Sequence, residues 1–344
     1  MTEFADVVEQ FLRSKLPSVT ELKVTGCRPV SGGYSCEMTE FTAHMDGQEA
    51  RLIARSDAPH EQRVVDSGDR SREWRIVKEL TDGGVVPVPR ALWCDETGSY
   101  FGRPTMIMEF IEGQSVLGLL RTLPDERARY SDLICDLAAR IHSVSADFAP
   151  STLSRPDSWE IYMDGLVQQW RDAEAEYVIR EPVLRYIASW LDEHRPPPAP
   201  LGLVHSDFQP SNMLIDDRGL LAADWEFAHI GDPREDLGWA LWVEDVQPPK
   251  VIGLDLEAFC RRYRDRTGLS EEVINPYTVT YFSVLGSIGV HRRVLQQQAA
   301  LARGENMSIR TAYIGGVISA AHRRWLDSLH NLRSTESLQI GVAG

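Results

Sequence analysis

Apolar positions over residues 1–111 follow two different spacings. Residues 1–20 repeat every three or four positions, which predicts an amphipathic helix. From 21 to 56 the pattern becomes strand-like, and Asp46-Gly47 between two short runs predicts a hairpin, because both residues tolerate positive φ. A helix over about 70–80, ended by glycines, and an apolar strand over 104–111 complete a segment that is rich in strands.

The remainder of the chain is mostly helical in pattern. Residues 133–141 carry one apolar face, and further helical stretches follow at 159–177 and 182–191. One small β island over 202–223 is expected to interrupt the helices, which resume from about residue 234. Strands followed by helices predict the α+β class with two lobes rather than a doubly wound sheet.

Composition and charge exclude several classes of partner. The 344 residues include 36 Lys and Arg against 51 Asp and Glu, so the formal net charge is -15, whereas a nucleic-acid-binding protein normally shows a basic face. The apolar stretch over 277–290 is too short for a bilayer, which takes about 20 apolar residues. The first ten residues are acidic and lack the apolar core of a secretory signal. We therefore expect no nucleic-acid partner and no membrane contact.

The five cysteines are scattered along the chain. Their number is odd and no C-x-x-C pair occurs, so neither a disulfide framework nor a zinc site is expected. A reducing compartment fits this usage, and the predicted location is cytoplasmic.

Chemistry-bearing residues concentrate between 203 and 239. The sequence there contains His205-x-Asp207-x-x-x-x-Asn212, then a short predicted hairpin, then Asp224-Trp225-Glu226. Phosphoryl transfer needs an aimed hydroxyl, an acceptor for its proton and Mg²⁺ on the phosphate oxygens. A carboxylate in a loop can take the proton, while an amide and a second carboxylate can supply oxygen ligands to the cation. The sequence therefore holds the residue types that this chemistry requires.

A purely structural interpretation also exists for each of these residues. Asp and Asn in loops commonly cap helices or make turns, and a lone histidine such as His205 is commonly packed in a core. The combined spacing, in which apolar strands bracket all of the polar groups, favours the functional interpretation.

Residues 203–239 resemble the catalytic core of the aminoglycoside phosphotransferase and choline kinase family, which are relatives of the protein kinases. The end of this segment, DWEFAHIGDPREDLGW, is most similar to the kinase-like domain fused to certain acyl-CoA dehydrogenases. The resemblance implies a protein-kinase-like two-lobed fold, with an N-terminal antiparallel β lobe and a mainly helical C-terminal lobe. It also implies transfer of the γ-phosphate of ATP, with Mg²⁺, to a hydroxyl of a small molecule.

The same resemblance implies an organisation of the chain and roles for the matching residues. The expected divisions are an N-terminal nucleotide-binding lobe over 1–112, a C-terminal catalytic and acceptor-binding lobe over 113–331, and a flexible tail over 332–344. Asp207 would be the catalytic base, His205 would brace its loop, and Glu226 would assist a second ion. Asn212 and Asp224 would hold magnesium. Asp236 resembles the aspartate that bonds the catalytic-loop backbone in kinases, although the dipole of a helix start would favour an acidic residue equally.

The residues expected to bind the nucleotide are less clearly marked in the sequence than the predicted catalytic residues. No G-x-x-x-x-G-K-[ST] motif occurs, so a Walker-type phosphate site is absent. The candidate phosphate loop consists of Ser31, Gly32, Gly33, Tyr34 and Ser35, which equally describe a turn. Kinases carry a lysine on the third strand, held by a helix glutamate; here Arg55 stands in that place and Glu73 could pair with it. Backbone groups near Glu109 and Ile111 would meet the adenine edge.

Several alternatives stay open at the level of sequence. The acceptor is a hydroxyacyl-CoA, an amino sugar or a choline-like alcohol, the donor is ATP or GTP, and the protein is a monomer or a homodimer. A catalytically inactive nucleotide-binding pseudokinase, acting as a scaffold, is the alternative function. The presence of all three of Asp207, Asn212 and Asp224 argues against it.

Overall fold

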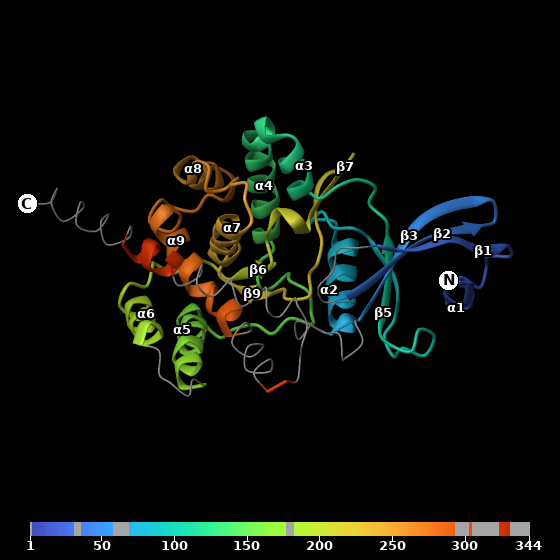
Figure 1. Cartoon of the computed structure of the whole chain (residues 1–344), viewed down its shortest axis with the longest axis horizontal. Coiled ribbons are helices and arrows are strands. Elements are labelled where there is room, and N and C mark those ends of the chain that lie inside the picture. Colours follow the sequence, from blue (N-terminus) through green and yellow to red (C-terminus); the bar gives the residue numbers. More distant parts are fainter. Residues whose placement is uncertain are drawn as a thin grey trace, which may run out of the picture. The chain divides into compact units, whose positions relative to one another are not determined.

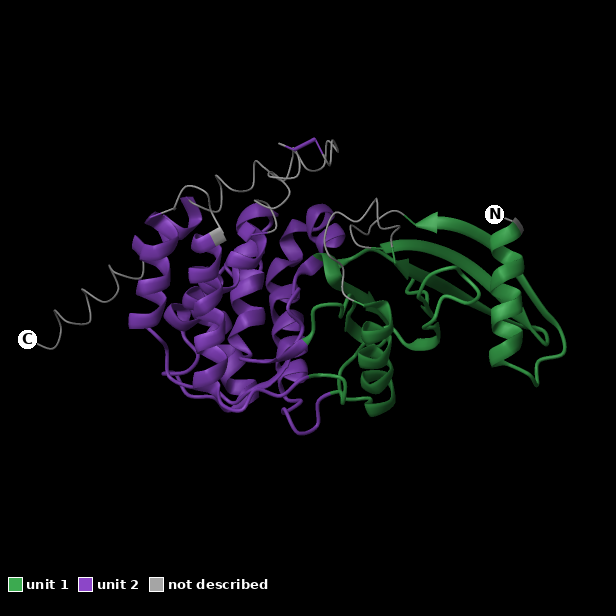
Figure 2. Ribbon diagram, turned by 90° about the horizontal axis from the view of Figure 1, so that it is seen from below, with its two compact units in different colours: residues 1–116, 150–153, 211–228 green, residues 117–149, 154–210, 229–344 purple. Residues whose placement is uncertain are grey.

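The computed structural model describes residues 2–30, 36–57, 69–176, 182–292, 303–304 and 323–330. The chain folds as two compact units, which Figure 2 shows in different colours. Unit 1 comprises Met1–Val116, Pro150–Leu153 and Ser211–Ala228, and unit 2 comprises Leu117–Ala149, Ser154–Pro210 and His229–Gly344. The assignment of the nucleotide to 1–112 and of the acceptor to 113–331 stays a prediction. The tail over 332–344 lies outside the described residues.

Unit 1 is built around a five-stranded antiparallel sheet with the strand order β1-β2-β3-β5-β4. The hairpin predicted at Asp46-Gly47 joins β2 to β3, with φ of 47° and 81° at the two turn residues. The strands are β1 (Leu22–Val30), β2 (Cys36–Met45), β3 (Gln48–Asp57), β4 (Ala91–Asp95) and β5 (Thr105–Glu109).

Two helices accompany this sheet (Figure 1). Helix α1 (Thr2–Lys15) buries Val8, Phe11 and Leu12 in a core shared with β1, β2 and β3. Helix α2 (Arg70–Gly83) begins after Asp69, whose side chain accepts a hydrogen bond from Ser71 N at 2.9 Å, and it ends at Gly84 with φ of 64°. The glycine stop predicted for this helix is therefore confirmed.

The hairpin of β7 (Met213–Asp216) and β8 (Gly219–Ala222) also belongs to unit 1. Met213 pairs with Ala222 at its open end, and Ala222 N donates to Pro87 O at 2.9 Å. These contacts attach a segment that lies far along the chain to the N-terminal sheet unit.

Unit 2 is mainly helical. Its described helices are α3 (Val116–Thr122), η2 (Pro124–Glu126), α4 (Arg127–His142), α5 (Trp159–Glu176), α6 (Pro182–Glu193), α7 (Arg234–Val246), α8 (Leu256–Thr267) and α9 (Pro276–Gly286), and η3 (Pro210–Asn212) lies at its border with unit 1. Helices α7 and α9 approach closely, because a Cβ on Gly238 would lie 2.5 Å from Phe282 C and Ser283 N. Strands followed by helices confirm the α+β class.

The β island expected over 202–223 is in fact two separate two-stranded sheets. Strand β6 (Gly202–Val204) pairs with β9 (His229–Gly231), while β7 pairs with β8. Strand β9 is three residues long, too short for an alternating pattern to reveal it. No helix of the described residues is long and apolar enough to span a membrane.

Candidate active site

The loop predicted to carry the catalytic base follows β6 in unit 2. His205 and Ser206 donate their backbone N–H groups to the two carboxylate oxygens of Asp236, at 2.9 and 2.8 Å. Asp236 lies in the first turn of α7 and is fully buried. Ser206 has φ of 69°, in the left-handed region that residues other than glycine seldom adopt. The expected contact between a helix-start aspartate and the loop backbone is therefore present.

Asp207 is half-buried and its carboxylate is held by two donors. Gln209 Nε2 and Trp239 Nε1 both donate to Asp207 Oδ1, at 2.6 and 2.8 Å. The backbone N–H of Asp207 donates to His205 Nδ1 at 3.2 Å, and His205 is only 1% exposed. These contacts fix the carboxylate of the predicted base, and the role of His205 as a support of the loop stays a prediction.

Asp236 is itself part of a buried polar pair. His142 Nε2 lies 3.0 Å from Asp236 Oδ2, and His142 Nδ1 lies 2.7 Å from the hydroxyl of Tyr263. Burial alone would raise the pKa of Asp236, but the hydrogen bond and charge of His142, together with His205, lower it below its ordinary value. Asp236 is therefore held as a carboxylate that accepts from the catalytic loop.

Asn212 and Asp224, the predicted magnesium ligands, stand at the two ends of the β7–β8 hairpin. The backbone N–H of Ala223 donates to Asn212 O at 2.8 Å, so the two ends lie side by side. Asp224 has φ of 71°, and its side chain is 29% exposed. Both residues belong to unit 1, whereas Asp207 belongs to unit 2.

Arg55 on β3 connects the predicted metal ligand to helix α2. Its Nη1 lies 2.8 Å from Glu73 Oε1 and its Nη2 lies 2.6 Å from Asp224 Oδ1. Glu73 is fully buried and also accepts from Trp225 N at 3.2 Å. The ion pair expected between Arg55 and Glu73 is thus present, and the role of both residues at a phosphate stays a prediction.

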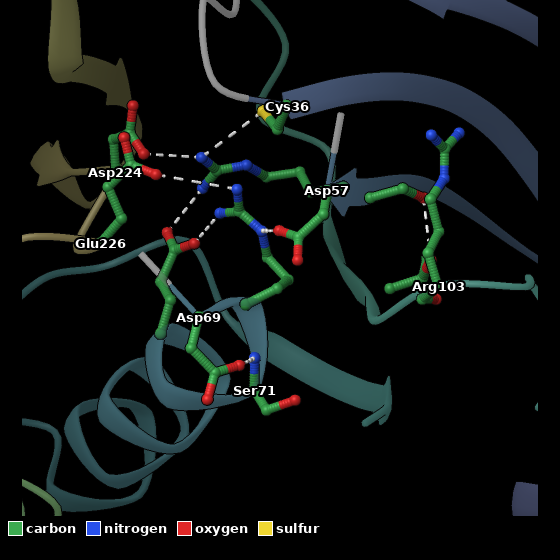
Figure 3. A network of polar contacts seen from close by, with 12 residues as sticks. Cys36, Asp57, Asp69, Ser71, Arg103, Asp224 and Glu226 are labelled. Carbon is green, nitrogen blue, oxygen red and sulfur yellow. Dashed lines mark hydrogen bonds and ion pairs between the residues drawn. The ribbon is translucent and has the colours of Figure 1, made fainter. Parts of the chain in front are cut away.

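A second buried arginine, Arg70, was not anticipated from the sequence. It bonds the other oxygen of Glu73 through Nη1, and its Nε lies 3.3 Å from Asp57 Oδ1. Arg55 and Arg70, together with the carboxylates around them, form a buried charge cluster. Figure 3 shows three of these carboxylates, Asp57, Asp224 and Glu226, around the guanidinium groups. The one available signal was the spacing of three residues between Arg70 and Glu73 on a helix, which surface pairs share.

Glu226 is the least satisfied carboxylate of this cluster. Its Oε2 makes no hydrogen bond, and the closest guanidinium nitrogen, Arg70 Nη2, lies 3.8 Å away and also lacks a hydrogen bond. Burial, reinforced by the negative charges of Asp224 and Glu73, raises the pKa of Glu226 to about 7. A buried polar atom without a protein partner is a position at which a water molecule or an ion can bind.

The charges of this cluster fit a divalent cation. Four carboxylates surround two guanidinium groups, which gives a formal charge of -2 when all six groups are ionised. The described part of the chain contains no group of three or more His, Cys, Asp or Glu side chains that would hold a metal alone. The carboxylate oxygens at this site instead suit a cation that brings phosphate ligands of its own, as Mg²⁺ does with a nucleotide.

The predicted adenine edge follows strand β5. Glu109 N already donates to Arg90 O at 3.0 Å, and the side chain of Glu109 pairs with Arg90 and Arg218. Ile111 lines an open cavity of about 580 Å³ together with Glu109, Phe110, Glu112 and residues 216–218. The predicted phosphate loop, Ser31 to Ser35, lies outside the described residues.

The family model that matches this chain carries the description "Phosphotransferase enzyme family", abbreviated APH, and it covers residues 26–271. The chain belongs to this family. The resemblance identified from residues 203–239 is therefore confirmed.

Solved structures of the family confirm the kinase-like fold. A putative aminoglycoside phosphotransferase from Ralstonia eutropha JMP134 is 20% identical, with a TM-score of 0.69 over 95% of this chain and 98% of that one. The macrolide 2'-phosphotransferase MphH from Brachybacterium faecium is 20% identical, with a TM-score of 0.61 over 92% and 97%. Aminoglycoside phosphotransferase APH(4)-Ia, solved with AMP-PNP and hygromycin B, is 19% identical, with a TM-score of 0.55 over 92% and 98%.

A curated relative fits the branch that the sequence resembles. The probable acyl-CoA dehydrogenase IBR3 of Arabidopsis thaliana is 25% identical over 231 residues, which cover 62% of this chain. The match spans only 27% of that relative's own length.

Proposed function

We propose that this phosphotransferase moves the γ-phosphate of ATP, with Mg²⁺, to a hydroxyl of a small molecule. The observation that carries the proposal is the fork of Arg55, which holds Glu73 and Asp224 at 2.8 and 2.6 Å within a buried, net negative cluster. Arg55 stands where the resemblance places the basic residue of the phosphate site, and it keeps the predicted cation ligand Asp224 beside it. The nucleotide complex of APH(4)-Ia supports ATP as the donor.

In this proposal Asn212 and Asp224 hold the cation, and Glu226 offers a further oxygen beside them. Magnesium would supply neutralisation of the charge that develops on the phosphate oxygens. Arg55, oriented by Glu73, would bind the phosphates, and the loop over residues 31–35 would cover them. Backbone groups near Ile111 would contact the base.

Asp207 accepts the proton of the acceptor hydroxyl in this proposal. The donors Gln209 and Trp239 engage Asp207 Oδ1 and fix the plane of the carboxylate, so the hydroxyl meets a preset base. The acceptor is an alcohol of the hydroxyacyl-CoA, amino sugar or choline-like type. The relative named as an acyl-CoA dehydrogenase supports the first type, and the complex with hygromycin B supports the second.

The variant Asp207→Asn tests the assignment of the base. We expect it to lower the rate of ADP formation by about 10²–10⁴-fold, the usual contribution of a general base, while ATP affinity changes less than about twofold. The assay follows ADP release with Mg²⁺ and a panel of hydroxyacyl-CoAs, amino sugars and cholines, and mass spectrometry detects the phosphorylated acceptor.

The surface variant Asp172→Asn is the matched control, because Asp172 is exposed on α5, where it bonds Gln168. It should retain the wild-type rate. Full activity of Asp207→Asn with the same acceptor would show that another group takes the proton.

A further inference from the structure

Four polar side chains of unit 2 form a continuous hydrogen-bonded chain that starts at the catalytic loop. Ser206 Oγ lies 2.8 Å from His229 Nδ1, and His229 Nε2 lies 2.8 Å from the hydroxyl of Tyr162. Tyr162 donates to Glu235 Oε1 at 2.7 Å, and Glu235 also accepts from Asp232 N at 2.8 Å. The chain joins the catalytic loop to β9, α5 and α7, and the family reaction as described above does not use it.

With a neutral His229, the carboxylate at the far end of the chain fixes the direction of each hydrogen bond. Tyr162 gives its single proton to Glu235, so its oxygen accepts from His229 Nε2–H. In a neutral imidazole Nδ1 then carries no proton, and it accepts from the hydroxyl of Ser206. Burial and the neighbouring Glu235 raise the pKa of Tyr162 well above its ordinary value, which keeps this donor protonated. The chain is therefore an ordered network rather than a set of interchangeable contacts.

Ser206 occupies a backbone conformation that costs free energy. Its φ of 69° is favourable for glycine and unfavourable for residues with a Cβ. A serine at this position introduces backbone strain that glycine would avoid. Unlike glycine, it supplies a hydroxyl, which bonds His229.

Gly231 on β9 provides the space in which the network converges. A Cβ at this position would lie 2.5 Å from Glu235 Oε1, 2.5 Å from the hydroxyl of Tyr162 and 2.7 Å from His229 Nε2. Any larger residue would push these three atoms apart. The absence of a side chain at residue 231 is thus required for the contacts to form.

The network and the predicted base are held by the same face of α7. Glu235 and Trp239 are four residues apart, so both side chains project from one side of the helix. Glu235 ends the chain that begins at Ser206, and Trp239 donates to Asp207 Oδ1. Two consecutive loop residues, Ser206 and Asp207, are consequently tied to one helix by two separate routes.

We propose that Ser206 and His229, supported by Tyr162 and Glu235, are positioning residues that hold Asp207 in its reactive orientation. The proposal rests on the proposed function, because it acts through the base assigned there. Loss of the network leaves the nucleotide site of unit 1 intact, so it lowers kcat and leaves the KM for ATP unchanged.

The pair Ser206→Gly and Ser206→Ala separates positioning from stability. Both variants remove the hydroxyl, but glycine also relieves the strained φ whereas alanine keeps it. The assay is hydrolysis of Mg·ATP with water as acceptor. We expect kcat to fall at least tenfold in both variants with the KM for ATP within twofold, while Tm is at or above the wild-type value in Ser206→Gly and below it in Ser206→Ala. Wild-type kcat in Ser206→Gly overturns the proposal.

A tyrosine pair supplies the matched control. Tyr162→Phe breaks the chain at its centre, whereas Tyr281→Phe removes another buried hydroxyl of unit 2, which bonds Leu191 O at 2.7 Å. Both should lower Tm, but only Tyr162→Phe should lower kcat. Equal kcat values in these two variants overturn the proposal.

Hydrogen exchange tests the network without any turnover. Amides of residues 203–209 should exchange faster in Tyr162→Phe than in the wild type and in Tyr281→Phe, and unchanged protection overturns the proposal. If the wild-type protein releases no ADP with any acceptor, the proposed function fails, and the exchange experiment still decides whether the network holds the loop.

Discussion

Glu73 is the residue on which the buried charges of unit 1 depend. One of its oxygens bonds Arg55 and the backbone N–H of Trp225, and the other bonds Arg70. Neither Glu73 nor Arg70 has any exposed surface, so water cannot replace these contacts. A single carboxylate thus bonds two buried cations, and its removal takes one ion-pair partner away from each of them.

The variant Glu73→Gln should therefore lower the free energy of unfolding by about 3 kcal/mol, the size expected when one partner of a buried ion pair is removed. Urea denaturation measures this change. Glu79→Gln on the same helix is the control, because Glu79 only bonds the exposed Ser151, and it should cost less than about 1 kcal/mol. Equal losses in the two variants would contradict the central position of Glu73.

Sequence reasoning reached some of these residues and not others, for a physical reason. Arg55 and Glu73 were found because one ends a strand and the other begins the next helix, positions that a kinase-like pattern specifies. Trp239 was missed because its contact with Asp207 joins segments 32 residues apart. Arg70 and Gln209 were missed because their contacts with Glu73 and Asp207 span two or three residues, a spacing that surface residues share. Nothing in a local pattern distinguishes a buried arginine from an exposed one.

At the scale of elements, the first turn of α2 sets the geometry of the charge cluster. Arg70 and Glu73 both lie in this turn, and Asp69 caps it by accepting from Ser71 N (Figure 3). The cap satisfies a backbone N–H that has no partner within the helix. An uncapped turn would fray, and Glu73 would then orient Arg55 less well.

We expect Asp69→Ala to lower the free energy of unfolding by about 1 kcal/mol and to weaken ATP binding, as measured by urea denaturation and calorimetric titration. Asp255→Ala removes the equivalent cap of α8, where Asp255 accepts from Ala258 N at 2.9 Å. This control should lose similar stability and keep its ATP affinity. Unchanged ATP binding in Asp69→Ala would show that the cap does not affect the nucleotide site. Because serine can also cap a helix, Asp69→Ser should keep both the stability and the ATP affinity of the wild type.

Elements with a clear period were predictable, and those defined only by pairing were not. The strands of unit 1 and helices α5, α6 and α7 lie where the apolar pattern placed them. Strand β9 exists because β6 provides its partner across the fold. The separation of the expected β island into two sheets has the same origin, since pairing is a tertiary property.

At the scale of the whole molecule, Asp236 makes the stability of the chain depend on pH. Its folded pKa is lower than its ordinary value near 4. The unfolded state therefore binds more protons in acid, and the stabilisation is complete above the unfolded pKa and is lost as pH falls through the folded pKa.

The variant Asp236→Asn removes this dependence. Its deficit in unfolding free energy relative to the wild type should be largest above about pH 5 and should shrink as the pH falls toward 3. Urea denaturation over pH 3–7 measures it. For the exposed control Asp172→Asn the difference from the wild type should stay constant, and a constant deficit for Asp236→Asn would contradict the linkage.

The sequence predicts the division of the chain into two units only in part. A β-rich part before a helical part predicted the two-lobed class, because periodicity changes along the chain. The assignment of Ser211–Ala228 to unit 1 depends on how the β7–β8 hairpin contacts residues such as Pro87. That choice is made by packing in three dimensions.

The presence of arginine rather than lysine at position 55 also affects which nucleotide affinity labels can react with this protein. Nucleotide affinity labels of the acyl-phosphate kind modify kinases by acylating a primary amine beside the bound phosphates, and a guanidinium that never loses its proton does not react in this way. The whole sequence contains four lysines, at positions 15, 23, 78 and 250, and none lies on β3. Proteome-wide profiling with such labels would therefore overlook this phosphotransferase, and ADP release or thermal-shift measurement is the better way to find its ligands.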